Sequence, residues 1–223
     1  MKRKLNIPFF IVIFWFTCGV SGLILPLQPD QISLDKILLA PDWEQWCGYD
    51  HLGRPICERL IMGAKTSFSV AIVVVLISFV IGTFFGVIGA WLGGVYDKFL
   101  VIMIDIFMAF PGILLAIVLA GLLGPGLVNT VIALSVVSWV GFSRLARIQT
   151  LSIKNQNHII AAHALGTLNY VIAFKHILPL IIAPLIIEAT FSVASVIIAE
   201  AGLSFLGLGI QPPSASWGSM IRD

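Results

Sequence analysis

The chain has 223 residues, of which 59% are hydrophobic and 11% are charged, and its mean hydropathy is +1.04. A soluble globular protein carries about a quarter charged residues, so this composition excludes a soluble domain and places the chain in a membrane. The net charge of +2 comes from scattered residues and not from a basic tract interleaved with aromatics, which excludes nucleic acid as a partner.

Apolar runs predict five membrane-spanning helices, because a bilayer core about 30 Å thick needs roughly 20 apolar residues in helical form. In chain order these runs are Ile7–Leu25, Ser67–Leu92, Phe99–Leu123, Leu127–Phe142 and Ile177–Ile198. Pro111 and Pro184 each remove a backbone hydrogen bond and are expected to kink their helices. Glycines 82, 86 and 89 have the spacing of a small-residue seam for helix packing. The predicted fold is an all-α polytopic membrane bundle.

The first apolar run has two interpretations. The basic start Met1–Lys4, the apolar residues after it and a small-residue stretch at 18–22 are also typical of a secretory signal peptide. The apolar run continues to near spanning length, which favours a retained span over residues 1–26. On either interpretation, the loop over residues 27–66 starts outside.

Basic residues in the connections predict a cytoplasmic N-terminus. One side of the membrane receives eight of them and the other receives five. The eight are Lys2, Arg3, Lys4, Lys98, Arg144, Arg147, Lys154 and Lys175. The loop over 144–176 contains no acid, whereas the loop over 27–66 contains six acidic residues. We therefore expect 144–176 to be cytoplasmic and 27–66 to be periplasmic.

The three cysteines, Cys18, Cys47 and Cys57, have neither a CxxC spacing nor a matching histidine pair, which argues against a zinc or iron–sulfur site. Cys47 and Cys57 can form a disulfide if their loop faces an oxidising compartment. Two unpaired thiols are the favoured interpretation, and whether the two cysteines pair stays open.

The cytoplasmic loop contains a short predicted helix from His158 to Leu165, ended by Gly166, the residue that most readily adopts a left-handed conformation. Thr167 or Asn169 is expected to cap a second helix that runs into the fifth span. His158 and His163 are five residues apart and lie on different helix faces, which argues against a metal site. On composition alone, the segment is also typical of an ordinary cytoplasmic loop.

A longer pattern in this loop resembles the coupling loop of bacterial ABC importer permeases, which reads EAA, three residues, Gly, nine residues, I-x-L-P. Here Ala161-Ala162, Gly166 and the ending His176–Pro179 match, and that ending is similar to the dipeptide, oligopeptide and nickel branch. Further stretches are similar to the same branch in the same order: 50–54, Asp105 with 109–111, 123–127, 199–209, 211–213 and 217–218. Ile160 stands where the family's loop opens with Glu.

The resemblance implies the transmembrane domain of a type I ABC importer, with spans two to five in a permease core over 67–223. The family has six spans, and this sequence ends at residues 221–223 in a loop that the family follows with a last span. The resemblance therefore predicts about five spans, an absent C-terminal span and a truncated or fragmentary product.

The function implied is a permease subunit that moves peptides across the bacterial inner membrane, multi-pass and coupled to separate ATPase subunits. The implied partners are a second permease subunit, two ATP-binding subunits that hold ATP and Mg, a periplasmic substrate-binding protein and the lipid bilayer. The chain itself is expected to be no enzyme and to bind no cofactor or metal, since no GxxxxGK[ST] phosphate loop occurs and Gly63-Ala64-Lys65-Thr66 has its lysine displaced. The implied ATPase-coupling residues are Ile159, Ile160, Ala161, Ala162, His163, Leu165, Gly166 and Pro179.

Three acids within or near predicted spans are candidates for the translocation path: Asp105, Glu188 and Glu200. A carboxylate at the bilayer centre costs about 2.5–3.5 kcal/mol, so each is expected to face water or a partner. Each also has a structural interpretation: Asp105 reaches the interface, Glu188 bonds a neighbouring helix, and Glu200 bonds the glycine-rich turn after it. The alternatives to a peptide importer are a nickel or metal-chelate permease of the same branch, an ion-coupled secondary transporter and a non-transporting scaffold.

Overall fold

The structure is a computed structural model, and it describes residues 10, 13, 17, 27–43 and 45–222. The predicted first span, Ile7–Leu25, falls almost entirely outside the described residues. The chain divides into two compact units. The terminal unit comprises Met1–Ala71, Leu123–Thr130 and Ile197–Asp223, and the central unit comprises Ile72–Leu122 and Val131–Val196.

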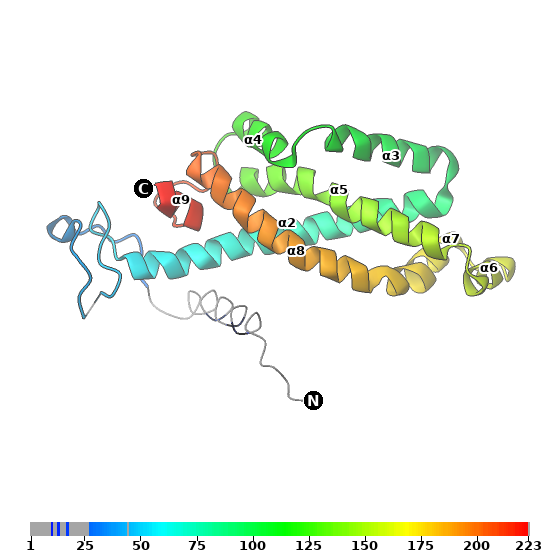
Figure 1. The fold of residues 1–223 in the computed structure, drawn as a ribbon, viewed down its shortest axis with the longest axis horizontal. Helices are drawn as coiled ribbons and strands as arrows, with labels where there is room; N and C mark the ends of the chain where they lie inside the picture. Colours follow the sequence, from blue (N-terminus) through cyan, green and yellow to red (C-terminus); the bar gives the residue numbers. More distant parts are fainter. Residues whose placement is uncertain (1–9, 11–12, 14–16, 18–26, 44, 223) are drawn as a thin grey trace. The chain divides into compact units, whose positions relative to one another are not determined.

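Helices make up nearly all regular structure in the described residues (Figure 1). In chain order they are η1 (Leu34–Lys36), α2 (Ile56–Leu92), α3 (Gly94–Met108), α4 (Gly112–Leu123), α5 (Leu127–Ile153), α6 (Asn157–Ala164), α7 (Asn169–Val171), the π-helix η2 (Ile172–Ile177), α8 (Leu178–Phe205) and α9 (Trp217–Arg222). Among the described residues, three helices are long and apolar enough to cross a membrane, or four if a bent pair counts as one span. This confirms the all-α membrane fold.

The predicted third span, Phe99–Leu123, is not one continuous helix. It is divided into α3 and α4, which meet at an angle of 84°. Pro111 lies in the break, where it has no backbone N–H to donate and also disfavours helical geometry in the residue before it. The kink expected at Pro111 is confirmed and is larger than a kink within one helix. Helix α8, in contrast, continues through Pro184.

Helix α2 begins at Ile56, well before the apolar run at Ser67 that predicted it, so the loop over 27–66 ends earlier than expected. Contacts with the loop hold these polar first turns of the helix. The backbone N–H of Gln28 donates to Glu58 Oε2 at 2.7 Å, and Arg59 is 3% exposed beside Asp30. Hydropathy predicts only the part of a helix that lipid surrounds. It therefore did not predict the first turns of α2, which contacts with the loop stabilise.

The glycine seam of α2 packs against other helices of the central unit, as predicted. A Cβ atom at Gly82 would collide with the Trp139 carbonyl oxygen, and one at Gly86 with the Ser143 carbonyl oxygen, both on α5. A Cβ at Gly89 would lie 2.7 Å from a methyl carbon of Leu100 on α3. The absence of side chains therefore lets α2 and α5 approach backbone to backbone.

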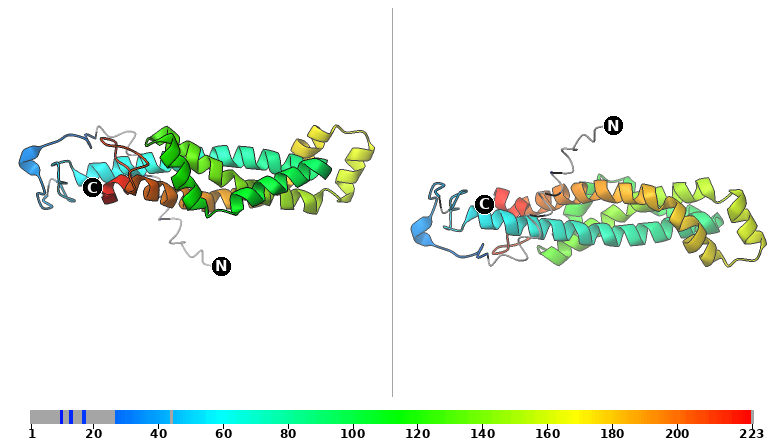
Figure 2. Two further views of the ribbon diagram at one scale, coloured as in Figure 1. Left: turned by 90° about the horizontal axis from the view of Figure 1, so that it is seen from above. Right: turned by 90° about the horizontal axis from the view of Figure 1, so that it is seen from below.

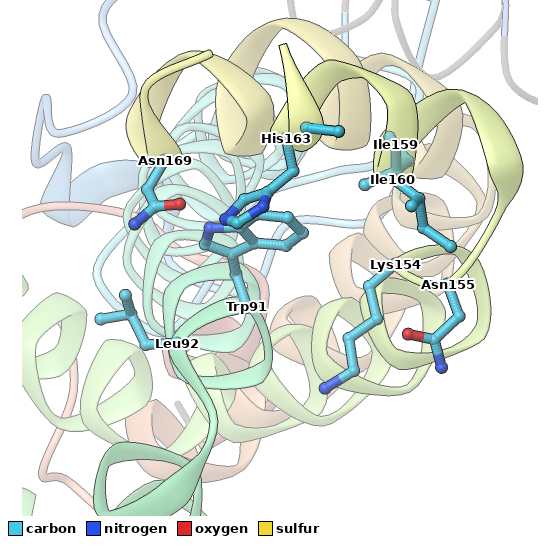
Figure 3. Close-up of a pocket in the computed structure, with 9 residues that line it drawn as sticks. Trp91, Leu92, Lys154, Asn155, Ile159, Ile160, His163 and Asn169 are labelled. Carbon is cyan, nitrogen blue, oxygen red and sulfur yellow. The ribbon is translucent and has the colours of Figure 1, made fainter. Parts of the chain in front are cut away.

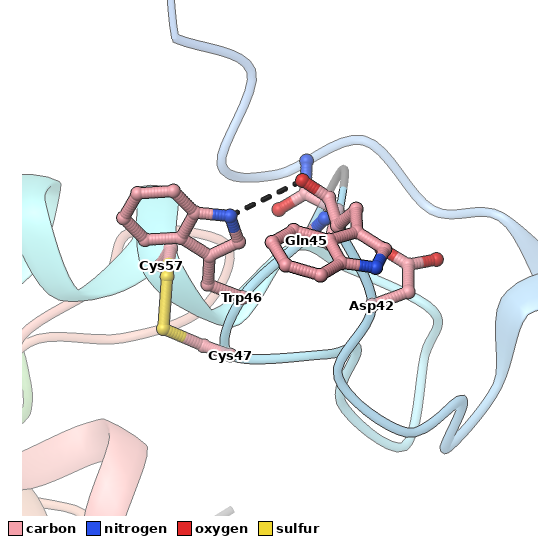
Figure 4. Close-up of a disulfide and its surroundings, with 6 residues drawn as sticks. Asp42, Gln45, Trp46, Cys47 and Cys57 are labelled. Carbon is pink, nitrogen blue, oxygen red and sulfur yellow. Dashed lines mark hydrogen bonds between the residues drawn. A yellow bond between two sulfur atoms is a disulfide. The ribbon is translucent and has the colours of Figure 1, made fainter.

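In the terminal unit, Cys47 and Cys57 form a disulfide that joins the loop to the first turn of α2 (Figure 4). The favoured interpretation of two unpaired thiols is therefore wrong. The spacing of ten residues did not reveal this contact, because it depends on how the loop folds back. Beside the bond, the indole N–H of Trp46 donates to the Trp43 carbonyl oxygen at 3.1 Å.

Asp50 organises the turn inside this loop. Its Oδ1 accepts the backbone N–H groups of Leu52 and Arg54, both at 2.9 Å, and its Oδ2 lies 2.6 Å from Arg54 Nε. Burial alone would raise the pKa of Asp50, but the Arg54 and Leu52 N–H groups and the Arg54 guanidinium outweigh burial and lower that pKa below its ordinary value.

This lowered pKa predicts that acid weakens the loop. A carboxylate whose folded pKa is depressed contributes stability that is complete above its unfolded pKa of about 4 and is lost as the pH falls through the folded value. Hydrogen-exchange protection of the Leu52 and Arg54 amides, corrected for intrinsic exchange rates, should therefore fall below about pH 4. The Asp50→Asn variant should show weak protection at every pH. Equal pH profiles in the two proteins would contradict the assignment.

Candidate coupling loop and translocation residues

Helix α6 (Asn157–Ala164) and the turn after it agree closely with the short helix predicted over 158–165. Gly166 has φ +81°, the left-handed conformation expected of it. Its N–H donates to the His163 carbonyl at 3.0 Å, and the Thr167 N–H donates to the Ala162 carbonyl at 3.1 Å. These two bonds form a Schellman motif, which satisfies the last carbonyl groups of the helix and fixes the direction of the exit.

After this turn, the chain re-enters a long helical run. Leu168 occupies the N-cap of α7 and no side chain bonds there, so the expected cap by Thr167 or Asn169 is wrong. The π-helix η2 follows and ends at Ile177, shortly before Pro179, whose nitrogen cannot donate to the helix. A π segment has a looser bonding pattern and is frequent at functional sites. In the central unit, α6 and α7 lie beyond the end of α5 (Figures 1 and 2).

One side chain anchors α6 to the rest of the central unit. Ile159 is completely buried, and the His163 ring lies edge-to-face against Trp91 with their centroids 6.2 Å apart. A pocket of about 500 Å³ opens beside these contacts (Figure 3). It is lined by Trp91, Leu92, Lys154, Asn155, Ile159, Ile160, His163, Ala164 and Asn169. Lys154 Nζ also donates to the Ala90 carbonyl at 3.2 Å, which ties the end of α5 to the end of α2.

Several apolar side chains of α6 and its exit are exposed. Leu165 is 87% exposed, Ile160 is 53% exposed, and Ala161 is also exposed, whereas Ala162 is half-buried. Such a group of apolar side chains on a short helix is typical of a protein-binding surface. Ile159 anchors one side of the helix, and these apolar side chains remain exposed on the other sides.

Asp105 lies in the last turns of α3 and lines a pocket of about 570 Å³ with side chains of α5. The pocket is lined by Val101, Ile104, Asp105, Met108, Ala109, Arg144, Arg147 and Ile148. Arg147 forms a two-point ion pair with Asp97, with distances of 2.6 Å from Nε and 2.8 Å from Nη2. We call this pocket the charged groove.

Glu188 and Glu200 lie elsewhere, so the three candidate acids do not share one site. Glu188 is half-buried on α8 in the central unit, and its Oε1 lies 3.3 Å from the position of a Cβ built on Gly141 of α5. Its role stays a prediction.

Glu200 is completely buried in the terminal unit. It accepts hydrogen bonds from the hydroxyls of Ser67 and Ser204, both at 2.7 Å. Ser204 Oγ in turn accepts the Ile210 N–H at 3.1 Å, and Ser67 Oγ accepts the Trp217 N–H at 3.4 Å. This network connects α2, α8 and the glycine-rich turn after α8. These contacts favour the structural interpretation of Glu200 over substrate contact.

Sequence reasoning missed the Asp97–Arg147 ion pair and the contact between Trp91 and His163. The sequence pattern uses the arginines only to predict topology. Asp97, just before the predicted third span, is an acid at a helix start, and such an acid is a signal that a neighbouring helix supplies a cation. Nothing in the spacing of Trp91 and His163 indicated their contact, because they lie far apart in sequence.

Comparisons with known proteins place the chain in one family. The model of the family described as "Binding-protein-dependent transport system inner membrane component" matches residues 79–223. The chain is 39% identical over its whole length to the dipeptide transport system permease protein DppC of Bacillus subtilis, of which it covers 70%. It is 40% identical over its whole length to DppC of Alkalihalophilus pseudofirmus, covering 74% of that protein. Over 85% of its length it is 37% identical to the glutathione transport system permease protein GsiD of Pectobacterium atrosepticum, of which it covers 63%.

The match to the family model covers α3 to α9 and contains all the motif stretches described above except 50–54. The chain therefore belongs to the family of binding-protein-dependent transport system inner-membrane components.

Proposed function

We propose that this chain is a permease subunit of an ATP-driven importer that moves peptides across the bacterial inner membrane. The relatives above are named for dipeptide and glutathione transport, which favours peptides over the nickel alternative. A second permease subunit completes the path, two ATP-binding subunits hold ATP and Mg, and a substrate-binding protein delivers the peptide from outside. The chain contributes no catalytic group and no cofactor.

The observation that carries this proposal is the anchored α6 with its exposed apolar surface. A helix fixed by the buried Ile159 and leading through Gly166 into α8 is a rigid element that transmits displacement. Leu165 and Ile160 supply the contact with the ATP-binding subunit. Ile160 makes this contact apolar at the position where the family pattern has a carboxylate.

The proposed orientation has the N-terminus and residues 144–176 in the cytoplasm, as the distribution of basic residues predicts. The disulfide between Cys47 and Cys57 supports it, because disulfides persist in oxidising compartments and the loop that contains this one is on the opposite side.

ATP-dependent uptake tests the proposal directly. The complex purified with its genetic neighbours and placed in vesicles should import labelled alanine peptides of two to five residues when ATP and the binding protein are supplied. Uptake that survives ATP depletion and collapses with the proton gradient would favour an ion-coupled transporter. Import of nickel and not of peptides would favour the metal alternative.

The coupling role makes a specific prediction for Gly166. A Gly166→Val variant should hydrolyse ATP while importing several-fold less peptide per ATP, because valine is strained at φ +81°. No atom lies within 4 Å of the added Cβ, so the strain is purely in the backbone. Gly166→Asn is the matched control, since asparagine tolerates the left-handed conformation and should retain coupling.

Crosslinking provides the second measurement. A Leu165→Cys variant should crosslink to an ATP-binding subunit in working membranes, because Leu165 is 87% exposed beside α6.

Equal peptide import per ATP in the valine and asparagine variants would contradict the coupling role of Gly166.

A further inference from the structure

We propose that the charged groove between α3 and α5 binds the two charged ends of a peptide in transit. Asp105 takes the α-ammonium group and Arg144 takes the α-carboxylate. This inference rests on the proposed function, because it concerns a peptide already delivered to the permease. It assigns a binding site for the peptide backbone within the chain.

One of the charged groups in the groove is already paired within the chain. Arg147 is committed to Asp97, with both carboxylate oxygens within 2.8 Å of its guanidinium nitrogens. The pair has no net charge, and both Asp97 oxygens already accept a hydrogen bond from Arg147. Of the groove's charged groups, Asp105 and Arg144 remain, one anion on α3 and one cation on α5.

Asp105 and Arg144 form no strong bond with the other described residues. Arg144 is exposed, and Nη1 donates to the thioether sulfur of Met108 at 3.7 Å. Thioether sulfur is a weak hydrogen-bond acceptor, so a carboxylate that replaced it would form a stronger bond with Arg144. Asp105 is also exposed, and among the described residues its carboxylate interacts with the charge of Arg147 without a direct hydrogen bond or ion pair. Both groups are therefore available to a ligand.

Lipid is excluded as the environment of these two groups. Asp105 lies about 16 Å along the axis of α3 from Gly94, which follows the turn after α2 at the membrane surface in the proposed topology. The groove also contains Arg144, the first residue of the segment placed in the cytoplasm, so the groove lies toward the cytoplasmic end of these helices in the proposed topology. A carboxylate facing hydrocarbon costs about 2.5–3.5 kcal/mol, so the groove must face water or protein.

The electrostatic field at the end of α3 has the sign that attracts a cation. Asp105 belongs to the last turn of α3, where the unpaired carbonyl groups of the helix already carry partial negative charge. A carboxylate at this end is unfavourable for the isolated helix, and it becomes favourable when a cation binds there. The carboxylate and the helix end therefore both attract an ammonium group.

The groove suits a peptide in size as well. Its volume of about 570 Å³ lies within the range of roughly 300–1,000 Å³ that small-ligand sites occupy. Ile104, Ile148 and Val101 supply apolar walls without a further charge, so side chains of different kinds are tolerated. A site that recognises the two termini tolerates varied side chains, and its two fixed charges select peptides of one length, because each added residue lengthens an extended chain by about 3.3–3.6 Å.

Substitution in the intact, reconstituted complex tests this site. Asp105→Asn and Arg144→Gln should each lower the import rate of labelled alanine peptides roughly tenfold, as expected for the loss of a hydrogen bond to a charged group. The affinity of the separate binding protein is unchanged, so the loss should be in the maximal rate. Asp105→Glu should retain most of the rate. Lys98→Gln removes an exposed charge from the same helix outside the groove and should import at the wild-type rate.

A capture experiment identifies the site itself. With Cys18 replaced by serine, an Ala109→Cys variant should be labelled by an alanine peptide that carries a thiol-reactive group, and excess unmodified peptide should prevent the labelling. Adding Asp105→Asn should reduce the labelling. A Val118→Cys variant, exposed on α4 away from the groove, should stay unlabelled.

Two outcomes overturn the inference. One is import at the wild-type rate by both Asp105→Asn and Arg144→Gln. The other is a combination of two results: the double variant Asp105→Arg with Arg144→Asp imports peptide at the full rate, and Ala109→Cys is not labelled. The two side chains would then pair with each other and not with the peptide. Failure of the proposed function is distinct, since the wild-type complex would then import no peptide at all.

Discussion

Replacing Gly86 with valine is expected to disrupt the packing of α2 against α5 and to lower the thermal stability of the purified protein. The Cβ atom alone would collide with the Ser143 carbonyl oxygen, and it would lie 2.8 Å from the Ala146 Cβ. Backbone atoms cannot rotate away, so the two helices must separate. Overpacking of this kind costs about 1–3 kcal/mol or more.

The expected shift follows from the size of the chain. At roughly 2–4 °C per kcal/mol, the midpoint of thermal unfolding in detergent or nanodiscs should fall by about 2–12 °C. Gly121→Val is the matched control, since it places the same side chain on α4, where no atom lies within 4 Å of the added Cβ. Equal midpoints for the two variants would show that α2 and α5 do not touch at Gly86.

Replacing Glu200 with alanine is the second change with a large expected effect. It removes the acceptor for the hydroxyls of Ser67 and Ser204 and leaves both groups buried. Each unsatisfied group costs about 1–3 kcal/mol, so the variant should lose roughly 2–6 kcal/mol. Hydrogen exchange at the Ile210 and Trp217 amides, which are bound to these serines, should accelerate strongly.

Glu200→Gln separates this structural role from a role in the translocation path. The amide has one acceptor and one donor group, and a serine hydroxyl serves either, so most of the network should survive. We expect slow exchange at Ile210 and near-normal import in this variant. Normal exchange combined with abolished import would instead identify Glu200 as a path residue.

Much of the fold was predictable because lipid imposes strong constraints on sequence. Apolar runs revealed α2, α5 and α8, since their side chains must be apolar where the helices cross a membrane. Gly166 and Pro111 revealed a helix end and a break, because their backbone preferences are local. The polar start of α2 escaped prediction, since contacts with a distant loop determine it.

The candidate site was predictable only in part, for a related reason. The coupling loop has a contiguous pattern, so its helix and its glycine turn were found within one residue of their observed limits. The charged groove is formed by Asp105 and Arg144, which lie far apart in sequence and meet because α3 packs beside α5. Such meetings depend on helix rotation, and the apolar pattern of these spans does not determine it.

The disulfide has a consequence for how the outer loop responds to acid. Cys47 and Cys57 are ten residues apart, and Asp50 and Arg54 both lie inside the ring that they close. A ring of this size removes chain entropy from the unfolded loop worth roughly 2.5–3 kcal/mol. Protonation of Asp50 therefore loosens a turn whose ends stay covalently tethered, and the full acid sensitivity of the turn emerges in the reduced protein.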